Sequence, residues 1–131
     1  MSHIVQAKTT ITHPNVALLG EALQIVVGAH TGGRVADHIL DYGQRAQRVN
    51  TQLALFTARV SRGIGIDVTP EGAMEFKGDP YLVEKEYQQL QQEIVQTYVS
   101  LATMRALEQM GYTSEANQVE QQVVIRGVTY A

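Results

Sequence analysis

Hydrophobic and polar residues alternate along several stretches of the chain, and this period of two predicts β-strands. Residues 2–11 are rich in β-branched side chains and contain no glycine or proline, so they predict a first strand. Residues 63–77 predict a hairpin, because the turn sequence Thr69-Pro70-Glu71-Gly72 interrupts their alternating apolar positions. A last strand is expected at about Val119–Tyr130.

Apolar residues that recur every three or four positions predict a first helix after residue 13. Thr12 or His13 is expected to cap this helix, because Pro14 suits the first helical position. Gly28 is expected to lie near its end. The apolar stripe of this helix comprises Val16, Leu19, Leu23 and Val26.

The longest helical pattern follows the predicted hairpin. Asp79 is expected to be its N-cap and Pro80 its first residue, and Gly111 is expected to end it in a left-handed conformation. The apolar stripe is broad enough to predict burial against a sheet. It comprises Val83, Tyr87, Leu90, Ile94, Tyr98 and Leu101.

The segment between the first helix and the hairpin fits two interpretations. Val35, Ile39 and Gly43 have the spacing of a helix. Alternatively, residues 34–42 and 47–57 are two strands that meet at Gly43, the second of them covered on both faces. Both interpretations remain open at this point.

The length of 131 residues predicts a single domain, residues 1–131, with one core. Helices separated by strands indicate the α+β class. We expect a ferredoxin-like antiparallel or mixed sheet with both helices on one face, in the order β-α-β-β-β-β-α-β. The chain has no cysteine, which excludes disulfides, a thiol nucleophile and cysteine-based metal sites.

Several short sequences resemble one family. They are Met1-Ser2-His3, Arg62-Gly63-Ile64-Gly65, Gly78-Asp79-Pro80-Tyr81 and residues 98–112. Together they resemble the domain of unknown function 1257 family, which includes the chloroplast hypothetical reading frame thirty-five proteins of algae and cyanobacteria. The resemblance implies a small soluble protein without an established activity, so it transfers no catalytic residue to this chain. Residues 28–62 match the family pattern least.

The beginning of the chain has no basic flank before a long apolar run, so a signal peptide is not expected. No apolar run is long enough to predict a membrane span. With 44% hydrophobic and 18% charged residues, the chain is expected to fold and to be soluble. We expect a cytoplasmic location, or the plastid stroma for an organellar protein, and a phage origin also fits.

Charge is distributed unevenly along the chain, whose net charge is −3. Residues 1–63 carry six cations against three acids, and residues 64–131 carry four cations against ten acids. The basic part predicts an anion-binding or nucleic-acid-binding face, with Tyr42 and Phe56 as stacking groups. The negative net charge and an aromatic content of 6% disfavour nucleic acid. The arginines of this face are Arg34, Arg45, Arg48, Arg59 and Arg62.

A metal site is a second hypothesis. Imidazole and carboxylate groups are ligands for several divalent metals, but no recognised spacing supports the set, and surface polar residues are the simpler interpretation. The four residues are His30, Asp37, His38 and Asp41. No serine lies in a nucleophile-elbow sequence and no phosphate-binding glycine motif is complete. We therefore expect no cofactor, and the sequence does not favour an enzyme.

Glutamine is concentrated on the longest predicted helix. Glutamine is a good helix former, so a neutral polar face exposed to solvent is the simpler interpretation. A neutral polar face also suits a surface that another protein covers. The glutamines are Gln88, Gln89, Gln91, Gln92 and Gln96. Our leading hypothesis is therefore a non-enzymatic interaction or assembly protein that binds itself or another protein. The alternative is a regulatory module that binds an anionic ligand or nucleic acid through its arginines.

Overall fold

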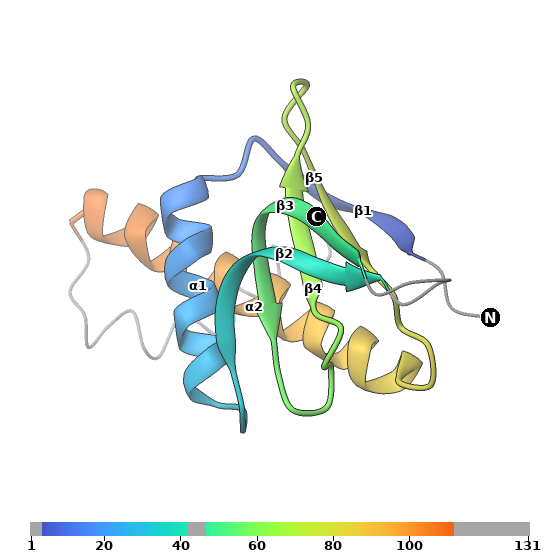
Figure 1. Ribbon diagram of the computed structural model, residues 1–131. Helices are drawn as coiled ribbons and strands as arrows, with labels where there is room; N and C mark the ends of the chain where they lie inside the picture. The colour runs from blue at the N-terminus through green and yellow to red at the C-terminus, as the bar shows by residue number, and fades with distance from the viewer. Residues whose placement is uncertain (1–3, 42–46, 112–131) are drawn as a thin grey trace.

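Strands and helices follow one another along the chain as shown in Figure 1, a computed structural model that describes residues 4–41 and 47–111. The elements are β1 (Val5–Thr12), α1 (Val16–Gly28), β2 (Arg34–Asp41), β3 (Gln47–Phe56), β4 (Ile64–Val68), β5 (Ala73–Gly78) and α2 (Glu84–Gln109). The predicted last strand, Val119–Tyr130, lies outside the described residues.

The five strands form one antiparallel sheet in the order β1-β5-β4-β3-β2. The α+β class predicted from the sequence is confirmed. The ferredoxin-like arrangement is not confirmed, because this sheet has more strands than that fold typically has. Consecutive hairpins join β2 to β5, whereas β1 pairs with β5 at the opposite edge from β2.

The segment with two open interpretations forms two strands, β2 and β3, and not a helix. Its connecting residues 42–46, which include Gly43, lie outside the described residues. The register between the two strands shifts between Ala36 and His38, which marks a β-bulge or a similar irregularity. A bulge bends a hairpin and increases its twist.

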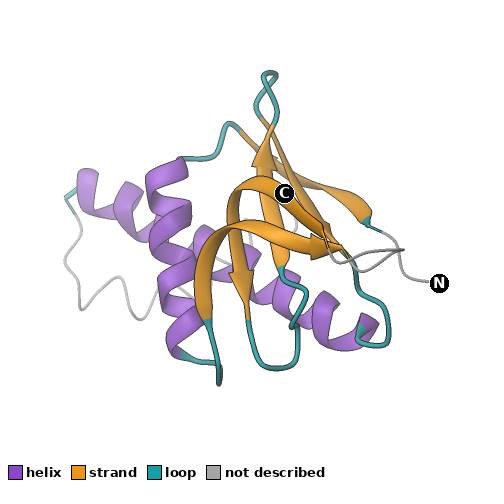
Figure 2. Cartoon of the chain, in the orientation of Figure 1, coloured by secondary structure: helices purple, strands orange, loops and turns teal. Residues whose placement is uncertain are grey.

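Both helices cover one face of the sheet, as predicted (Figure 2). Ile66 and Phe76 are opposite one another on β4 and β5, and they belong to the same buried cluster as the inward side chains of both helices. The helical members of this core are Leu18, Leu19, Ala22, Leu23, Val26, Tyr87, Leu90, Ile94, Tyr98 and Val99. Of the stripe predicted for the longest helix, Tyr87, Leu90, Ile94 and Tyr98 are buried in this core, whereas Val83 and Leu101 are half-buried.

The parts of β2 and β3 that carry Ile39 and Thr51 lie over the other face of the sheet (Figure 1). Ile39 is fully buried there, and a Cβ atom on Gly65 would lie 2.6 Å from Cγ2 of Thr51 and 3.2 Å from Cγ2 of Ile39. The backbone N–H of Leu40 also donates to the carbonyl of Arg62, at 2.9 Å. The glycine thus permits a close approach that any side chain would block.

The first helix begins later than predicted. Asn15, and not Thr12 or His13, is its N-cap, with its side-chain oxygen accepting from the backbone N–H of Leu18 at 3.1 Å. His13 has a φ of 49°, which no residue inside a right-handed helix adopts. The short polar side chain of Asn15 is therefore the first able to satisfy an N–H at the helix end.

The second helix also begins later than predicted, at Glu84 and with Val83 as its N-cap. Leu82 has a φ of 67°, so the helix cannot extend back to Pro80. Asp79 is 1% exposed and forms a buried ion pair instead of a helix cap. The predicted end is confirmed, because Gly111 follows the last helical turn with a φ of 91°.

Within the described residues, neither helix is long and apolar enough to cross a membrane.

Candidate functional site

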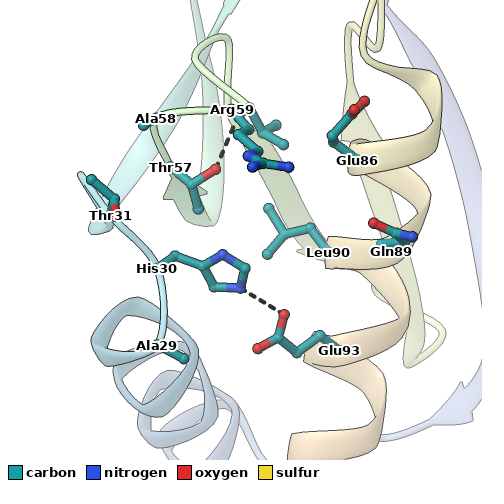
Figure 3. A pocket seen from close by; sticks show the side chains of 11 residues that line it. Ala29, His30, Thr31, Thr57, Ala58, Arg59, Glu86, Gln89, Leu90 and Glu93 are labelled. Atoms are coloured by element: carbon teal, nitrogen blue, oxygen red, sulfur yellow. Dashed lines mark hydrogen bonds and ion pairs between the residues drawn. The ribbon is translucent and has the colours of Figure 1, made fainter.

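A cleft of about 370 Å³ lies where two loops meet α2 (Figure 3). One loop follows α1 and contributes His30. The other joins β3 to β4 and contributes Arg59, and the side chains of Glu86 and Glu93 reach the cleft from α2. The cleft therefore combines residues from three parts of the chain that are far apart in sequence.

The imidazole of His30 is held by a carboxylate across the cleft. Nε2 of His30 lies 2.7 Å from Oε2 of Glu93, and both side chains are about one-third exposed. The backbone N–H of His30 donates to the backbone carbonyl of Val27 at 3.2 Å, so the backbone at His30 is held as well. With Nε2 used by Glu93, the other ring nitrogen, Nδ1, points toward Thr57 and the space beside Arg59 (Figure 3).

The loop that carries Arg59 is closed by short hydrogen bonds. The hydroxyl of Thr57 accepts from the N–H of Val60 at 3.0 Å, and the N–H of Ala58 donates to the carbonyl of Thr31 at 2.9 Å. This second bond joins the two loops of the cleft. Hydrogen bonds therefore fix the backbone on both sides of Arg59.

The guanidinium of Arg59 extends toward α2 from this loop (Figure 3). The side chain is exposed, and it has no hydrogen-bond or ion-pair partner within the part of the chain that the structure describes. The buried side chains of Leu90 and Val60 form an apolar part of the cleft wall. The arrangement offers a cation, an oriented imidazole and apolar surface to one small ligand.

Two other predicted anion-binding arginines lie on the β2–β3 hairpin and do not line the cleft. The guanidinium of Arg34 lies 4.0 Å from the centre of the Phe56 ring, and a terminal nitrogen of Arg48 lies 3.1 Å from Nδ1 of His38. Phe56 is only 3% exposed. It cannot stack on a base, so the predicted role of Phe56 in nucleic-acid binding is wrong.

Arg62 has a structural role. Its Nη1 lies 2.6 Å from Oδ2 of the buried Asp79, and its guanidinium lies 5.4 Å from the centre of the Tyr81 ring. Arg45, like Tyr42, lies outside the described residues. Of the arginines predicted to bind an anion, Arg59 is the one among the described residues that lines the cleft.

The residues of the metal hypothesis do not form one cluster. His30 is at the cleft, whereas Asp37, His38 and Asp41 are on β2. Oδ1 of Asp37 lies 3.1 Å from Nδ1 of His38, and this hydrogen bond holds the pKa of Asp37 below its ordinary value of 3.8. Over residues 4–41 and 47–111, no group of three or more His, Asp or Glu residues is placed to hold a metal ion.

The sequence hypotheses did not include the two acids of the cleft. Glu86 and Glu93 were part of an acidic helix with no distinguishing motif. The sequence marks His30 as a candidate metal ligand together with Asp37, His38 and Asp41. A contact between residues 63 positions apart, such as that of His30 with Glu93, leaves no local signal in a single sequence.

Comparisons of the chain with protein-family models, with curated proteins and with solved structures found no match. The resemblance to the domain of unknown function 1257 family stays a prediction.

The glutamine-rich side of α2 lies beside β1. A groove of about 700 Å³ separates them, and its walls include Gln88, Gln91, Gln92 and Gln96 together with Lys8 and Thr10. Among the described strands, β1 pairs only with β5, so its other edge carries no strand there. The predicted neutral polar surface therefore borders a sheet edge.

Proposed function

We propose that this protein is a small non-enzymatic binding module that holds a ligand with an anionic group in the cleft between His30 and Arg59. The observation that carries this proposal is the position of Arg59 beside a formed cleft, without a partner of its own among the described residues. A guanidinium forms charge-assisted hydrogen bonds with carboxylate or phosphate oxygens.

His30 supports the same function. Because Nε2 is used by Glu93, its Nδ1 side is the one presented to a ligand. The ring donates from Nδ1 when both nitrogens carry protons and accepts at Nδ1 when only Nε2 does. His30 can therefore serve either an anionic oxygen or a hydroxyl group of the ligand.

The size of the cleft favours a small ligand. Its volume of about 370 Å³ is at the lower end of the range for ligand sites, roughly 300–1,000 Å³. A nucleic acid is disfavoured, because the other described arginines are engaged elsewhere. Neither the hydroxyl of Thr31 nor that of Thr57 is hydrogen-bonded to His30, so no hydroxyl of the cleft is paired with a base, which favours binding over catalysis.

An NMR titration of the full chain with acetate and with inorganic phosphate tests the proposal. We expect backbone amide shifts of Thr31, Ala58 and their neighbours to change and to saturate. Arg59→Gln is expected to weaken this binding about tenfold or more, which corresponds to about 1.4 kcal/mol.

Arg105→Gln is the matched control. Arg105 is also exposed, with 55% of its side chain accessible, and lies on α2 with Glu21 as its partner at 3.4 Å. Its replacement changes the net charge equally and is expected to leave binding unchanged. Equal losses in the two variants would contradict a specific site at Arg59.

Self-association is a second candidate function, and the observation that favours it is the edge of β1 beside the glutamine-lined groove. We infer that a second copy of the chain would pair with this edge, because two copies of one strand can pair antiparallel about a twofold axis. Sedimentation at increasing concentration tests this. Gln91→Lys should shift a dimer to monomer, and a monomer at every concentration would contradict it.

A further inference from the structure

The cleft that Arg59 lines is also lined by negatively charged side chains. Glu86 lines it from the first turn of α2, and this carboxylate has no hydrogen-bond or ion-pair partner within residues 4–41 and 47–111. No ion pair between Arg59 and Glu86 is formed across the cleft. Arg59 and Glu86 therefore line the same small space without neutralising each other, while the second carboxylate, Glu93, is held by His30.

A zwitterion matches this set of charges better than a simple anion does. Glu86 and Glu93 both line the cleft, so an anion that binds Arg59 would also be repelled by two carboxylates. Ala29, the C-cap of α1, lines the cleft as well, and the C-terminal end of a helix carries partial negative charge. These groups favour a ligand that brings a positive charge together with its negative one.

We infer that the ligand is a small zwitterion of the α-amino acid class. This inference rests on the proposed function of the cleft. The ligand carboxylate binds the guanidinium of Arg59, and its ammonium group binds the carboxylate of Glu86. The aliphatic part of the ligand lies against Leu90 and Val60, which are buried and apolar. Each charged group of ligand and protein then has a partner of opposite sign.

The three probes of the test differ by one charged group at a time. L-valine carries both charges, 3-methylbutanoate lacks the ammonium group, and 2-methylpropylamine lacks the carboxylate. NMR titrations of the full chain at one pH and one low ionic strength measure the three affinities. We expect L-valine to bind at least about tenfold more tightly than either of the other probes.

Glu86→Gln identifies the group that recognises the ammonium. In this variant we expect L-valine and 3-methylbutanoate to bind with similar affinity. Glu84→Gln is the matched control, because Glu84 lies in the same first turn of α2 but does not line this cleft. That variant should keep the tenfold preference for L-valine.

The outcomes separate the inference from the function on which it rests. If 3-methylbutanoate binds the wild-type chain as tightly as L-valine, the zwitterion inference is wrong and the proposed anion-binding function stands. If 2-methylpropylamine binds as tightly as L-valine, the carboxylate is not recognised and both are wrong. If no probe binds, and acetate and phosphate do not bind either, both are likewise wrong.

Discussion

Nε2 of His30 lies 2.7 Å from Oε2 of Glu93, although the two residues are 63 positions apart in the chain. This contact joins the loop after α1 to the middle of α2 and forms one side of the cleft. Because Glu93 contacts Nε2, Nδ1 is the ring nitrogen of His30 that points into the cleft. The chemistry available at His30 therefore depends on a residue of a different element.

Replacing Glu93 by alanine should release the His30 ring at a small cost in stability. Both side chains are about one-third exposed, so we expect the free energy of unfolding to fall by about 1 kcal/mol or less. In the wild type, the neutral ring should carry its proton on Nε2. NMR detection of the ring nitrogens should show this single tautomer in the wild type and a mixture in Glu93→Ala. A mixture in both proteins would contradict the orienting role of Glu93.

Gly65→Ala should destabilise the protein by about 1–3 kcal/mol, because the new Cβ would overlap Thr51 and press on Ile39. Urea denaturation of the purified variant measures this change. Gly20→Ala is the matched control, since a Cβ at Gly20 meets nothing within 4 Å inside α1. That substitution should stabilise the protein by about 0.5–1 kcal/mol. Similar effects of the two substitutions would show that the hairpin does not cover β4 as described.

Tyr87 should make the protein less stable in alkali. Burial, and to a smaller extent the charge of Asp79, raises the pKa of the Tyr87 hydroxyl well above its ordinary value of 10.0. Above about pH 10 the unfolded chain loses this proton while the folded chain keeps it. The free energy of unfolding therefore falls as pH rises, by at most about 1.4 kcal/mol per pH unit from this group.

Tyr87→Phe removes the ionisable group and keeps the aromatic ring in the core. Denaturation between pH 8 and pH 11 should show a shallower loss of stability for this variant than for the wild type. Below about pH 9, where the tyrosine is protonated in both folded and unfolded chains, the two proteins should show parallel pH dependence. Equal slopes above pH 10 would contradict the raised pKa of Tyr87.

Arg62→Gln should destabilise the fold strongly, by about 3–5 kcal/mol, because it leaves the carboxylate of Asp79 buried without its ion-pair partner. The double variant Arg62→Gln with Asp79→Asn should recover a large part of this loss, since it removes the buried charge. A double-mutant cycle measured by urea denaturation tests the coupling. Additive effects of the two substitutions would mean that the pair is not formed.

The two helix starts show where local reasoning from the sequence failed. Asp79 followed by Pro80 has the residue types of a helix start, but Asp79 is held by Arg62, which lies 17 positions earlier. The left-handed conformation of Leu82 then delays α2 to Glu84. A side chain that is suited to cap a helix can be recruited by a distant partner, and no local pattern records that choice.

The segment that forms β2 and β3 illustrates a different limit. Alternating apolar residues on β3 favoured a strand covered on both faces, and Ala54 and Leu55, which point to opposite faces, are both fully buried. For β2 the helical spacing of Val35 and Ile39 competed with the strand interpretation. Pairing with β3 decides between them, because the stability of a strand depends more on packing against its neighbours than on the propensities of its own residues.

The sequence by itself determined the elements whose signals are local: the β4–β5 hairpin with its turn at Gly72, the buried stripe of α2 and the helix end at Gly111. Periodicity and backbone preference act within a few residues, so one sequence is enough to reveal them. The tertiary structure alone decided the strand order, the burial of Asp79 and the cleft. Arg59, His30 and Glu86 meet there because packing brings distant segments together, and the free energy of that packing is distributed over the whole core.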